Sequence, residues 1–95
     1  MEGNLIVKFS VEYTKDVIKD LKKLDNYTKQ MIKIWIEKHL AGCENPRAFG
    51  KALKGNLQGR WRYRIGDYRL LCKIEDEKMV IVAITVGHRK EIYKG

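Results

Sequence analysis

Basic and apolar side chains alternate without a break along residues 60–65, which read Arg-Trp-Arg-Tyr-Arg-Ile. A period of two is typical of a β-strand, because successive side chains point to opposite faces of a sheet. Arg60, Arg62 and Arg64 are therefore expected on one face. Guanidinium groups bind phosphate through paired hydrogen bonds, so the pattern points to a site for an anion.

The residues that follow predict a β-hairpin. The dipeptide Gly66-Asp67 suits a type II′ turn, which has glycine at its first central position. A two-residue loop then places Arg64 directly opposite Arg69, and a slip of one residue would mix polar and apolar side chains on both faces. The arginine face is thus predicted to contain Arg60, Arg62, Arg64, Arg69 and Lys73, and the opposite, apolar face Trp61, Tyr63, Ile65, Tyr68, Leu70 and Cys72.

Opposed arginines on one sheet face repel each other, at a cost of up to about 1 kcal/mol for a directly opposed pair. The pair Arg64 and Arg69 would carry that cost, and a bound anion would relieve it. The alternative is that the arginine face is simply solvated, since Lys and Arg side chains are normally exposed. The clustering of arginines with few acids favours the anion site.

The overall composition agrees with an anionic partner. The chain has 95 residues, 20 Lys and Arg and 12 Asp and Glu, for a formal net charge of +8. Residues 1–45 contribute +1 of this and residues 46–95 contribute +7. Nucleic acid, an acidic protein or an anionic membrane surface would each match this charge. The length allows one small domain over residues 1–95, and excludes a dinucleotide-binding α/β domain or a propeller.

Several other classes are disfavoured. No apolar run reaches the roughly 18 residues of a membrane span, and no signal peptide is visible, so we expect a cytoplasmic protein without a membrane partner. Cys43 and Cys72 do not form a CxxC pair and are expected as reduced thiols. His39 and His88 are the only histidines, so we expect no metal site and no cofactor.

The surrounding pattern predicts the elements that position the arginines. A short strand is expected over residues 5–9, followed by a helix that Ser10 or Thr14 caps, with Asp20 among its water-facing residues. Asp25-Asn26 should end this helix and cap a second one that fades near residues 41–42. The second helix is expected to bury an apolar face. That face contains Tyr27, Met31, Ile34 and Trp35, with Ile32 and Ile36 beside it.

The C-terminal half predicts the rest of the fold. Residues 43–59 should form a structured loop, and residues 79–86 a central strand, since they are almost wholly apolar. The predicted fold class is α+β, with a small antiparallel sheet of about four strands and an N-terminal αα-hairpin packed on one face. Since the helices need apolar partners, we expect them to cover the apolar face of the hairpin and to leave the arginine face open.

Together these segments carry a resemblance. From Phe9 onward the chain resembles the RelE/ParE superfamily of bacterial and archaeal toxins, and more closely its RelE branch. No single segment is diagnostic, but their order and spacing are specific. The matching segments are Asp20-Leu21-Lys22-Lys23-Leu24, Leu53-Lys54-Gly55, residues 61–70, Val86-Gly87-His88-Arg89 and Tyr93.

The resemblance implies a RelE-like fold of the microbial ribonuclease type and a toxin of a type II toxin–antitoxin system. RelE toxins enter the ribosomal A site and cut mRNA there without a metal. The ribose 2′-hydroxyl attacks the adjacent phosphate and leaves a 2′,3′-cyclic phosphate. The implied partners are the ribosome carrying mRNA and an acidic, RelB-like antitoxin. Such a reaction needs a dense cationic surface for its transition state, and it needs RNA.

The same resemblance suggests roles for individual residues. Arg64, Arg69, Arg89 and Tyr93 fall at positions where the family has catalytic or phosphate-contacting residues. His88 is added as a catalytic candidate, because histidine is the nearby side chain whose ordinary pKa is close to neutrality. The best-known RelE has lysines in place of Arg62 and Arg64, and an arginine cannot give up its proton, so a lysine-base mechanism does not transfer. Proton transfer is therefore expected from His88 or Tyr93. The residues expected to bind phosphate are Arg62, Lys54, Arg60 and Lys90.

The sequence leaves three alternatives open. His88 could be a solvated histidine at a strand end. The chain could be a ParE-like toxin that inhibits gyrase and has no nuclease activity, although that branch tends to lack the full set of basic residues and the terminal tyrosine. It could also be an RNA-binding module that uses the arginine face passively.

Overall fold

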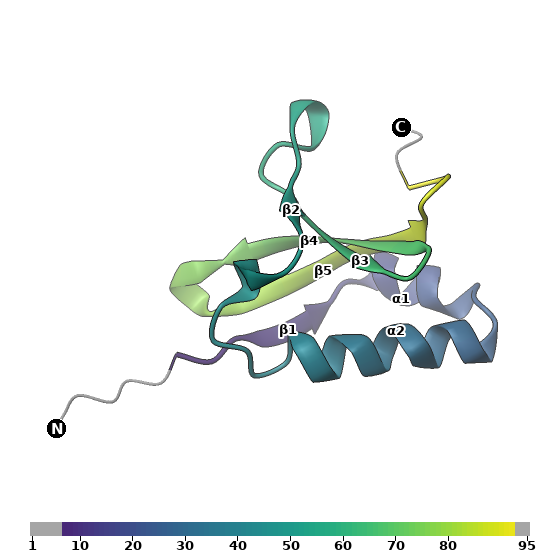
Figure 1. Cartoon of the computed structure of the whole chain (residues 1–95), viewed down its shortest axis with the longest axis horizontal. Helices are drawn as coiled ribbons and strands as arrows, with labels where there is room; N and C mark the ends of the chain where they lie inside the picture. The colour runs from purple at the N-terminus through teal and green to yellow at the C-terminus, as the bar shows by residue number, and fades with distance from the viewer. Residues whose placement is uncertain (1–6, 93–95) are drawn as a thin grey trace, which may run out of the picture.

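The computed structural model of the chain describes residues 7–92 and shows two helices packed beneath a twisted sheet (Figure 1). The α+β class is as predicted. In chain order the elements are β1 (Ser10–Tyr13), α1 (Lys15–Lys22), α2 (Asn26–His39), β2 (Lys51–Ala52), β3 (Trp61–Ile65), β4 (Tyr68–Glu75) and β5 (Val80–His88), with short 3₁₀ turns at Pro46–Ala48, Gly55–Leu57 and Asp76–Lys78.

The sheet differs in detail from the prediction. It has five strands in the order β1-β5-β4-β3-β2, and β1 runs parallel to β5, so the sheet is mixed rather than antiparallel. The hairpin partner β4 occupies one edge of β5, and β1 pairs with the other edge. Nothing in the local sequence indicates such a pairing, because the partners Ser10 and Val80 are brought together only by the folded chain.

The first strand also lies later than predicted. The expected strand over residues 5–9 begins outside the described residues, and the strand that forms is β1, at Ser10–Tyr13. Phe9 is buried, and its backbone pairs instead with the segment after α2: its N–H donates to Cys43 O at 2.8 Å and its carbonyl accepts from Gly42 N at 2.8 Å.

The helical hairpin begins where its caps predict. The Thr14 hydroxyl accepts from Val17 N at 3.1 Å and donates to Ala83 O at 2.9 Å, so one side chain caps α1 and ties it to β5. The Asp25 carboxylate accepts from Thr28 N at 3.1 Å and caps α2. This hydrogen bonding lowers the pKa of Asp25.

The core lies between the helices and the apolar face of the hairpin, as predicted. Tyr63 and Leu70 of the sheet are fully buried, together with Val17 of α1 and Ile32 and Ile36 of α2. The Tyr63 hydroxyl donates to Pro46 O at 2.6 Å, which satisfies a polar group inside the core. Desolvation raises the pKa of this hydroxyl.

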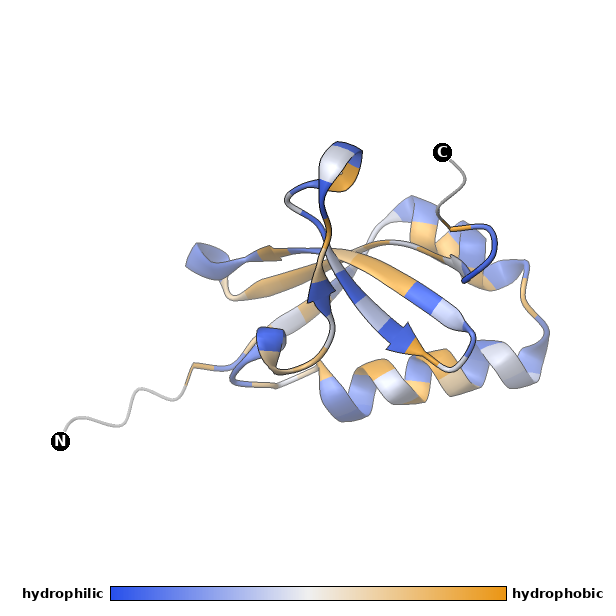
Figure 2. Cartoon of the chain, turned by 45° about the horizontal axis from the view of Figure 1, so that its top comes forward, coloured by the Kyte–Doolittle hydropathy of each residue, from blue (hydrophilic) through white to orange (hydrophobic). Residues whose placement is uncertain are grey.

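The predicted buried face of α2 is wrong. Tyr27 is 79% exposed and Ile34 is 61% exposed, while Ile32 and Ile36 face the sheet. The helix carries two neighbouring apolar stripes, and hydrophobic periodicity cannot tell which of them packs inward. Figure 2 shows hydrophobic residues in α2 beneath the sheet.

The loop over residues 43–59 is structured, as predicted, and hydrogen bonds attach it to the strands of the hairpin and to the turn after β4. The Arg47 guanidinium pairs with both Asp76 carboxylate oxygens at 2.9 Å, and Trp61 Nε1 donates to Phe49 O at 2.7 Å. The segment beyond β2, residues 53–59, projects away from the sheet (Figure 1). The loop thus holds β2 at the sheet edge beside β3.

Gly50 is the point at which this loop requires glycine. Its φ is +82°, and a Cβ there would overlap Arg62 O and lie 2.7 Å from Trp61 Nε1. We predict that Gly50→Ala lowers the free energy of unfolding in urea by about 2–4 kcal/mol, because left-handed strain adds to the overlap. Gly55→Ala is the matched control, since φ is +65° but no atom lies within 4 Å, and it should cost about 1 kcal/mol. Equal losses in the two variants would contradict the overlap argument.

Candidate nucleic-acid interface

The β3–β4 register brings the candidate arginines together at one end of the sheet. Arg64 pairs with Arg69, as the predicted hairpin register requires. Arg69 in turn pairs with Gly87 of β5. Gly66 has a φ of +59°. Asp67 is not among the described residues with positive φ, which fits the predicted type II′ turn. Arg64, Arg69 and Gly87 therefore form one row across β3, β4 and β5, next to the turn that joins β3 to β4.

Arg69 departs from the open arginine face that the sequence predicts. It is only 8% exposed, and its Nη1 donates to Gly66 O and to Tyr68 O, each at 3.0 Å. The guanidinium folds back over the turn, and within residues 7–92 it forms no ion pair with a carboxylate. Leu71, on the same side of β4, is also buried. The arginine face is therefore open only in part: Arg64 and Lys73 are exposed, and Arg60 and Arg62 are half-buried.

Arg89 follows the end of β5 and is held at the turn between β3 and β4, the turn beside which Arg64 and Arg69 lie. Its backbone N–H donates to Asp67 O at 2.8 Å, and its Nε lies 4.0 Å from the Asp67 carboxylate. Both side chains are more than half exposed, so this pair contributes little to stability. We name Arg64, Arg69 and Arg89 the turn cluster. It holds three cations beside one exposed acid.

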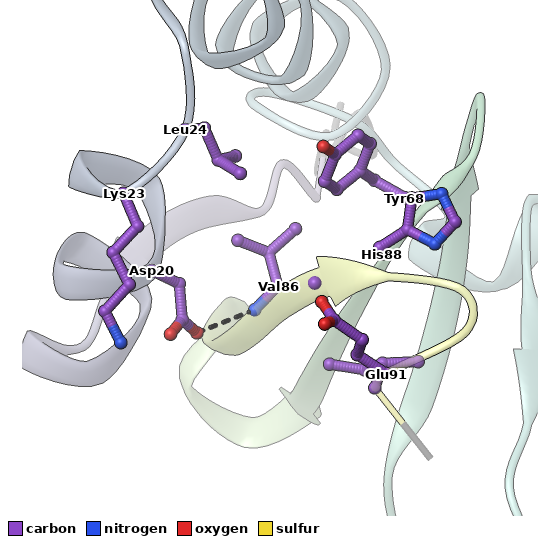
Figure 3. A pocket seen from close by; sticks show the side chains of 9 residues that line it. Asp20, Lys23, Leu24, Tyr68, Val86, His88 and Glu91 are labelled. Atoms are coloured by element: carbon purple, nitrogen blue, oxygen red, sulfur yellow. Dashed lines mark hydrogen bonds between the residues drawn. The ribbon is translucent and has the colours of Figure 1, made fainter. Parts of the chain in front are cut away.

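His88 lies apart from the turn cluster. His88 pairs with Tyr68, and Tyr68 pairs with Ile65, which is buried against the helices. The His88 ring therefore lies on the helix side of the sheet, on the face opposite Arg64 and Arg69. The His88 and Tyr68 rings meet edge to face at 5.6 Å (Figure 3). Lys90 N donates to His88 Nδ1 at 3.2 Å, which places the proton of the neutral ring on Nε2.

A cavity of roughly 400 Å³ opens on the His88 side, between the end of α1 and the end of β5 (Figure 3). Asp20 anchors it: one carboxylate oxygen accepts from Thr85 Oγ1 at 2.6 Å and from Val86 N at 3.0 Å. The prediction that Asp20 faces water is therefore wrong. Only the contact with a distant strand reveals its role, and the helix pattern carries no signal of it.

The remaining candidates are scattered. Lys54 precedes the projecting 3₁₀ turn, and Lys90 is exposed just after β5. Tyr93 lies outside the described residues.

Cys72 is fully buried, which raises the pKa of its thiol to about 12, so it is not a nucleophile at neutral pH. Among residues 7–92, no group of three His, Cys, Asp or Glu side chains could hold a metal ion.

Comparison with known proteins identifies the family. A family described as the ParE toxin of type II toxin–antitoxin systems matches residues 11–93. The chain belongs to the RelE/ParE toxin family. It is 43% identical over 49 residues to toxin RelG of Mycobacterium tuberculosis, a match that spans 52% of this chain and 56% of RelG. No helix in the described part of this toxin could cross a membrane.

Solved structures agree with this assignment. The RelBE2 toxin–antitoxin complex from Mycobacterium tuberculosis superposes with a TM-score of 0.75 at 31% identity, covering 87% of this chain and 100% of that one. The isolated RelE toxin of E. coli superposes with a TM-score of 0.67 at 26% identity, covering 90% of each chain. The predicted RelE-like fold is confirmed, and the chain is a toxin of the RelE/ParE type.

The opposed arginines generate a prediction about anion binding. We expect Arg64→Gln to raise the free energy of unfolding at low ionic strength by up to about 1 kcal/mol, because it removes repulsion from Arg69. Inorganic phosphate should raise the Tm of the wild type more than chloride of equal ionic strength does, and Arg64→Gln should lose most of that difference.

Lys73→Gln is the control. It removes a cation from the same face of β4, but at the far end, where Lys73 lies 3.7 Å from Glu75. Its phosphate response should equal that of the wild type. Thermal scans in matched buffers measure both effects, and an unchanged phosphate response in Arg64→Gln would rule out the turn cluster as an anion site.

Proposed function

We propose that this toxin is a ribosome-dependent mRNA endoribonuclease that cleaves in the ribosomal A site without a metal and so inhibits translation. The observation that carries the proposal is the turn cluster, in which Arg64 stands opposite Arg69 and Arg89 joins them with one nearby acid. Family membership supports the proposal, since the similar proteins bear RelE-type names. The site of action is then the cytoplasm.

The proposed chemistry is transesterification. The ribose 2′-hydroxyl attacks the adjacent phosphorus, the bond to the 5′-oxygen breaks, and a 2′,3′-cyclic phosphate and a 5′-hydroxyl result. Negative charge builds on the phosphoryl oxygens, and fixed cations that are already oriented stabilise it. Arg69 suits this role, since the Gly66 and Tyr68 carbonyls hold its guanidinium before RNA arrives. Exposed Arg64 and Arg89 would close around the phosphate.

The other basic residues would track the RNA backbone. Arg60 and Arg62 lie along β3, Lys54 lies on the projecting segment and Lys90 follows β5. Each contact of these residues with a phosphate would add salt-dependent affinity. Their role in this proposal is binding rather than bond cleavage.

Proton transfer is assigned to His88 and Tyr93. In the neutral ring Nδ1 accepts from Lys90 N and Nε2 carries the proton. In the imidazolium form both nitrogens carry protons, and in this proposal the imidazolium donates its Nε2 proton to the leaving 5′-oxygen and returns to the neutral ring. RNA would have to cross the end of the sheet to meet both this ring and the turn cluster. The task of accepting the 2′-hydroxyl proton then falls to Tyr93.

An acidic, RelB-like antitoxin is the proposed regulatory partner. Four of the similar solved structures are complexes of a RelE toxin with a RelB antitoxin. An acidic protein would neutralise a chain of net charge +8.

The second candidate function is inhibition of gyrase without nuclease activity. The matching family carries the ParE description, which favours keeping it. Passive RNA binding is the third candidate.

Primer extension on translating ribosomes separates the three candidates. We expect A-site cleavage by the wild type, a loss of about 10²–10³-fold in rate for Arg69→Ala, and a comparable loss for Tyr93→Phe. Lys73→Ala, which removes an exposed cation distant from the turn cluster, should retain nearly full activity. Circular dichroism checks that each variant is folded.

Other outcomes decide against the proposal. Stalled gyrase with intact mRNA would support the ParE-like candidate. RNA binding without cleavage would support the passive module. Cleavage that persists in Arg69→Ala would remove the turn cluster from the mechanism. His88→Ala should slow cleavage at saturating ribosome concentration, whereas a loss of RNA affinity alone would leave that rate unchanged.

A further inference from the structure

Within residues 7–92, the last part of β5 has no neighbouring strand on its β1 side. β1 pairs with β5 only over Val80–Ala83, whereas β5 continues to His88. The backbone groups of a bare sheet edge need other partners, because an N–H or a carbonyl that lacks both a partner and water lowers stability. Helix α1 and its cap supply such partners at this edge.

Thr14 and Asp20 take the place of the strand that is missing from this edge. The Thr14 hydroxyl, which caps α1, donates to Ala83 O at 2.9 Å. Further along β5, Asp20 Oδ2 accepts from Thr85 Oγ1 at 2.6 Å and from Val86 N at 3.0 Å. A hydroxyl bond of this length is typical of a charged carboxylate acceptor. The helix therefore continues the line of hydrogen bonds that β1 begins.

Asp20 is unfavourable for α1 taken alone. Aspartate is a weak helix former inside a helix, and a negative charge in the last turn opposes the helix dipole. Asp20 lies in the last turn of α1 beside Lys19 and Lys22, which have the favoured sign there. Another lysine at this position would suit the helix better. The benefit of Asp20 to the protein therefore comes from its contact with β5.

This contact lies next to the residues assigned to the reaction. Val86 precedes His88 by two positions and Arg89 by three. β4 pairs with the other edge of β5 as far as His88, and Arg89 N donates to Asp67 O at 2.8 Å. Figure 3 shows the Asp20 carboxylate reaching Val86 N from α1, with His88 further along β5. Asp20 thus holds one edge of a strand whose other edge adjoins the turn cluster.

We propose that Asp20 is a positioning residue for the cleavage reaction. Its carboxylate holds the end of β5, so that His88 and Arg89 keep their places beside Arg64 and Arg69. Asp20 acts through the backbone of β5 and does not meet the substrate. A displacement of about 1 Å at a reacting group can lower a rate about a hundredfold, so one anchoring contact can control the rate. This inference rests on the proposed function for its effect on cleavage, whereas the hold on β5 is a property of the toxin alone.

Amide hydrogen exchange followed by NMR tests the hold on β5 in the whole toxin without RNA. In Asp20→Ala we expect the Val86 and Arg89 amides to exchange at least tenfold faster, because the end of the strand is released. The Ser10 amide, at the start of β1, should stay within twofold of the wild type and reports any general loss of stability. Asp20→Asn should behave like the wild type, since its amide oxygen can accept the same hydrogen bonds.

Single-turnover cleavage on translating ribosomes tests the effect on the reaction. Asp20→Ala should lower the rate at saturating ribosome concentration by about tenfold to a hundredfold. The ribosome concentration that gives half the maximal rate should stay within threefold, because the basic residues proposed to track RNA are unchanged. Asp20→Asn should restore most of the rate. Such recovery separates positioning from proton transfer, since an amide does not accept a proton at neutral pH.

Thr14→Ala is the matched control variant. It removes the cap of α1 and the bond to Ala83 O, so it loosens the same helix from the same strand, but earlier along β5. Thermal melting should show a fall in Tm at least as large as that of Asp20→Ala. The cleavage rate should nevertheless stay within twofold of the wild type once the folded fraction is taken into account.

Three results would overturn the inference. Unchanged exchange of the Arg89 amide in Asp20→Ala would mean that β5 does not need the carboxylate, even if the wild type cleaves mRNA. Equal losses of cleavage in Thr14→Ala and Asp20→Ala would reduce the effect to stability. An Asp20→Asn variant as slow as Asp20→Ala would assign Asp20 a role that depends on its charge. Faster exchange at Arg89 in a toxin that cleaves no mRNA would instead refute the nuclease proposal and leave the hold on β5 in place.

Discussion

The pairing of β3 with β4 is the constraint on which the rest of the toxin depends. A two-residue turn with glycine at its first position leaves one register, and in that register Tyr63 and Leu70 point toward the helices. The same register forces Arg64 and Arg69 into opposition on the other face. The core and the charged site are therefore two consequences of one pairing, and neither can move without the other.

Two distant segments complete the site that this hairpin begins. The end of β5 reaches the turn through the hydrogen bond from Arg89 N to Asp67 O, and the loop before β2 closes on the hairpin through the Tyr63 hydroxyl and Pro46 O. Both contacts use backbone carbonyls, which stay in place when side chains change. The basic residues thus stand on a scaffold that needs little reorganisation to meet a phosphate.

The structure separates two surfaces with different chemistry. The turn cluster is cationic and lies at one end of the sheet, whereas the outer side of α2 is apolar and exposes Tyr27 and Ile34. His88 belongs to neither surface, because its ring lies on the helix side of the sheet beside Tyr68. A protein with a partly open cationic sheet face and an exposed apolar helix side can offer separate places to an RNA and to an acidic protein.

Local patterns determined much of this protein from the sequence alone. The hairpin register follows from strict alternation and a two-residue turn, and the starts of both helices follow from Thr14 and Asp25, because each of these signals acts within a few residues. Only the tertiary structure decided that β1 runs parallel to β5, that α2 buries Ile32 and leaves Ile34 in water, and that Asp20 accepts from Val86 N. It also decided that Arg69 folds inward and that His88 lies apart from the arginines. The contact of Asp20 with Val86 joins residues 66 positions apart. Hydrophobic periodicity carries no information about the partner that a side chain will find, whether that partner is distant in the chain or, like the Gly66 carbonyl for Arg69, close to it.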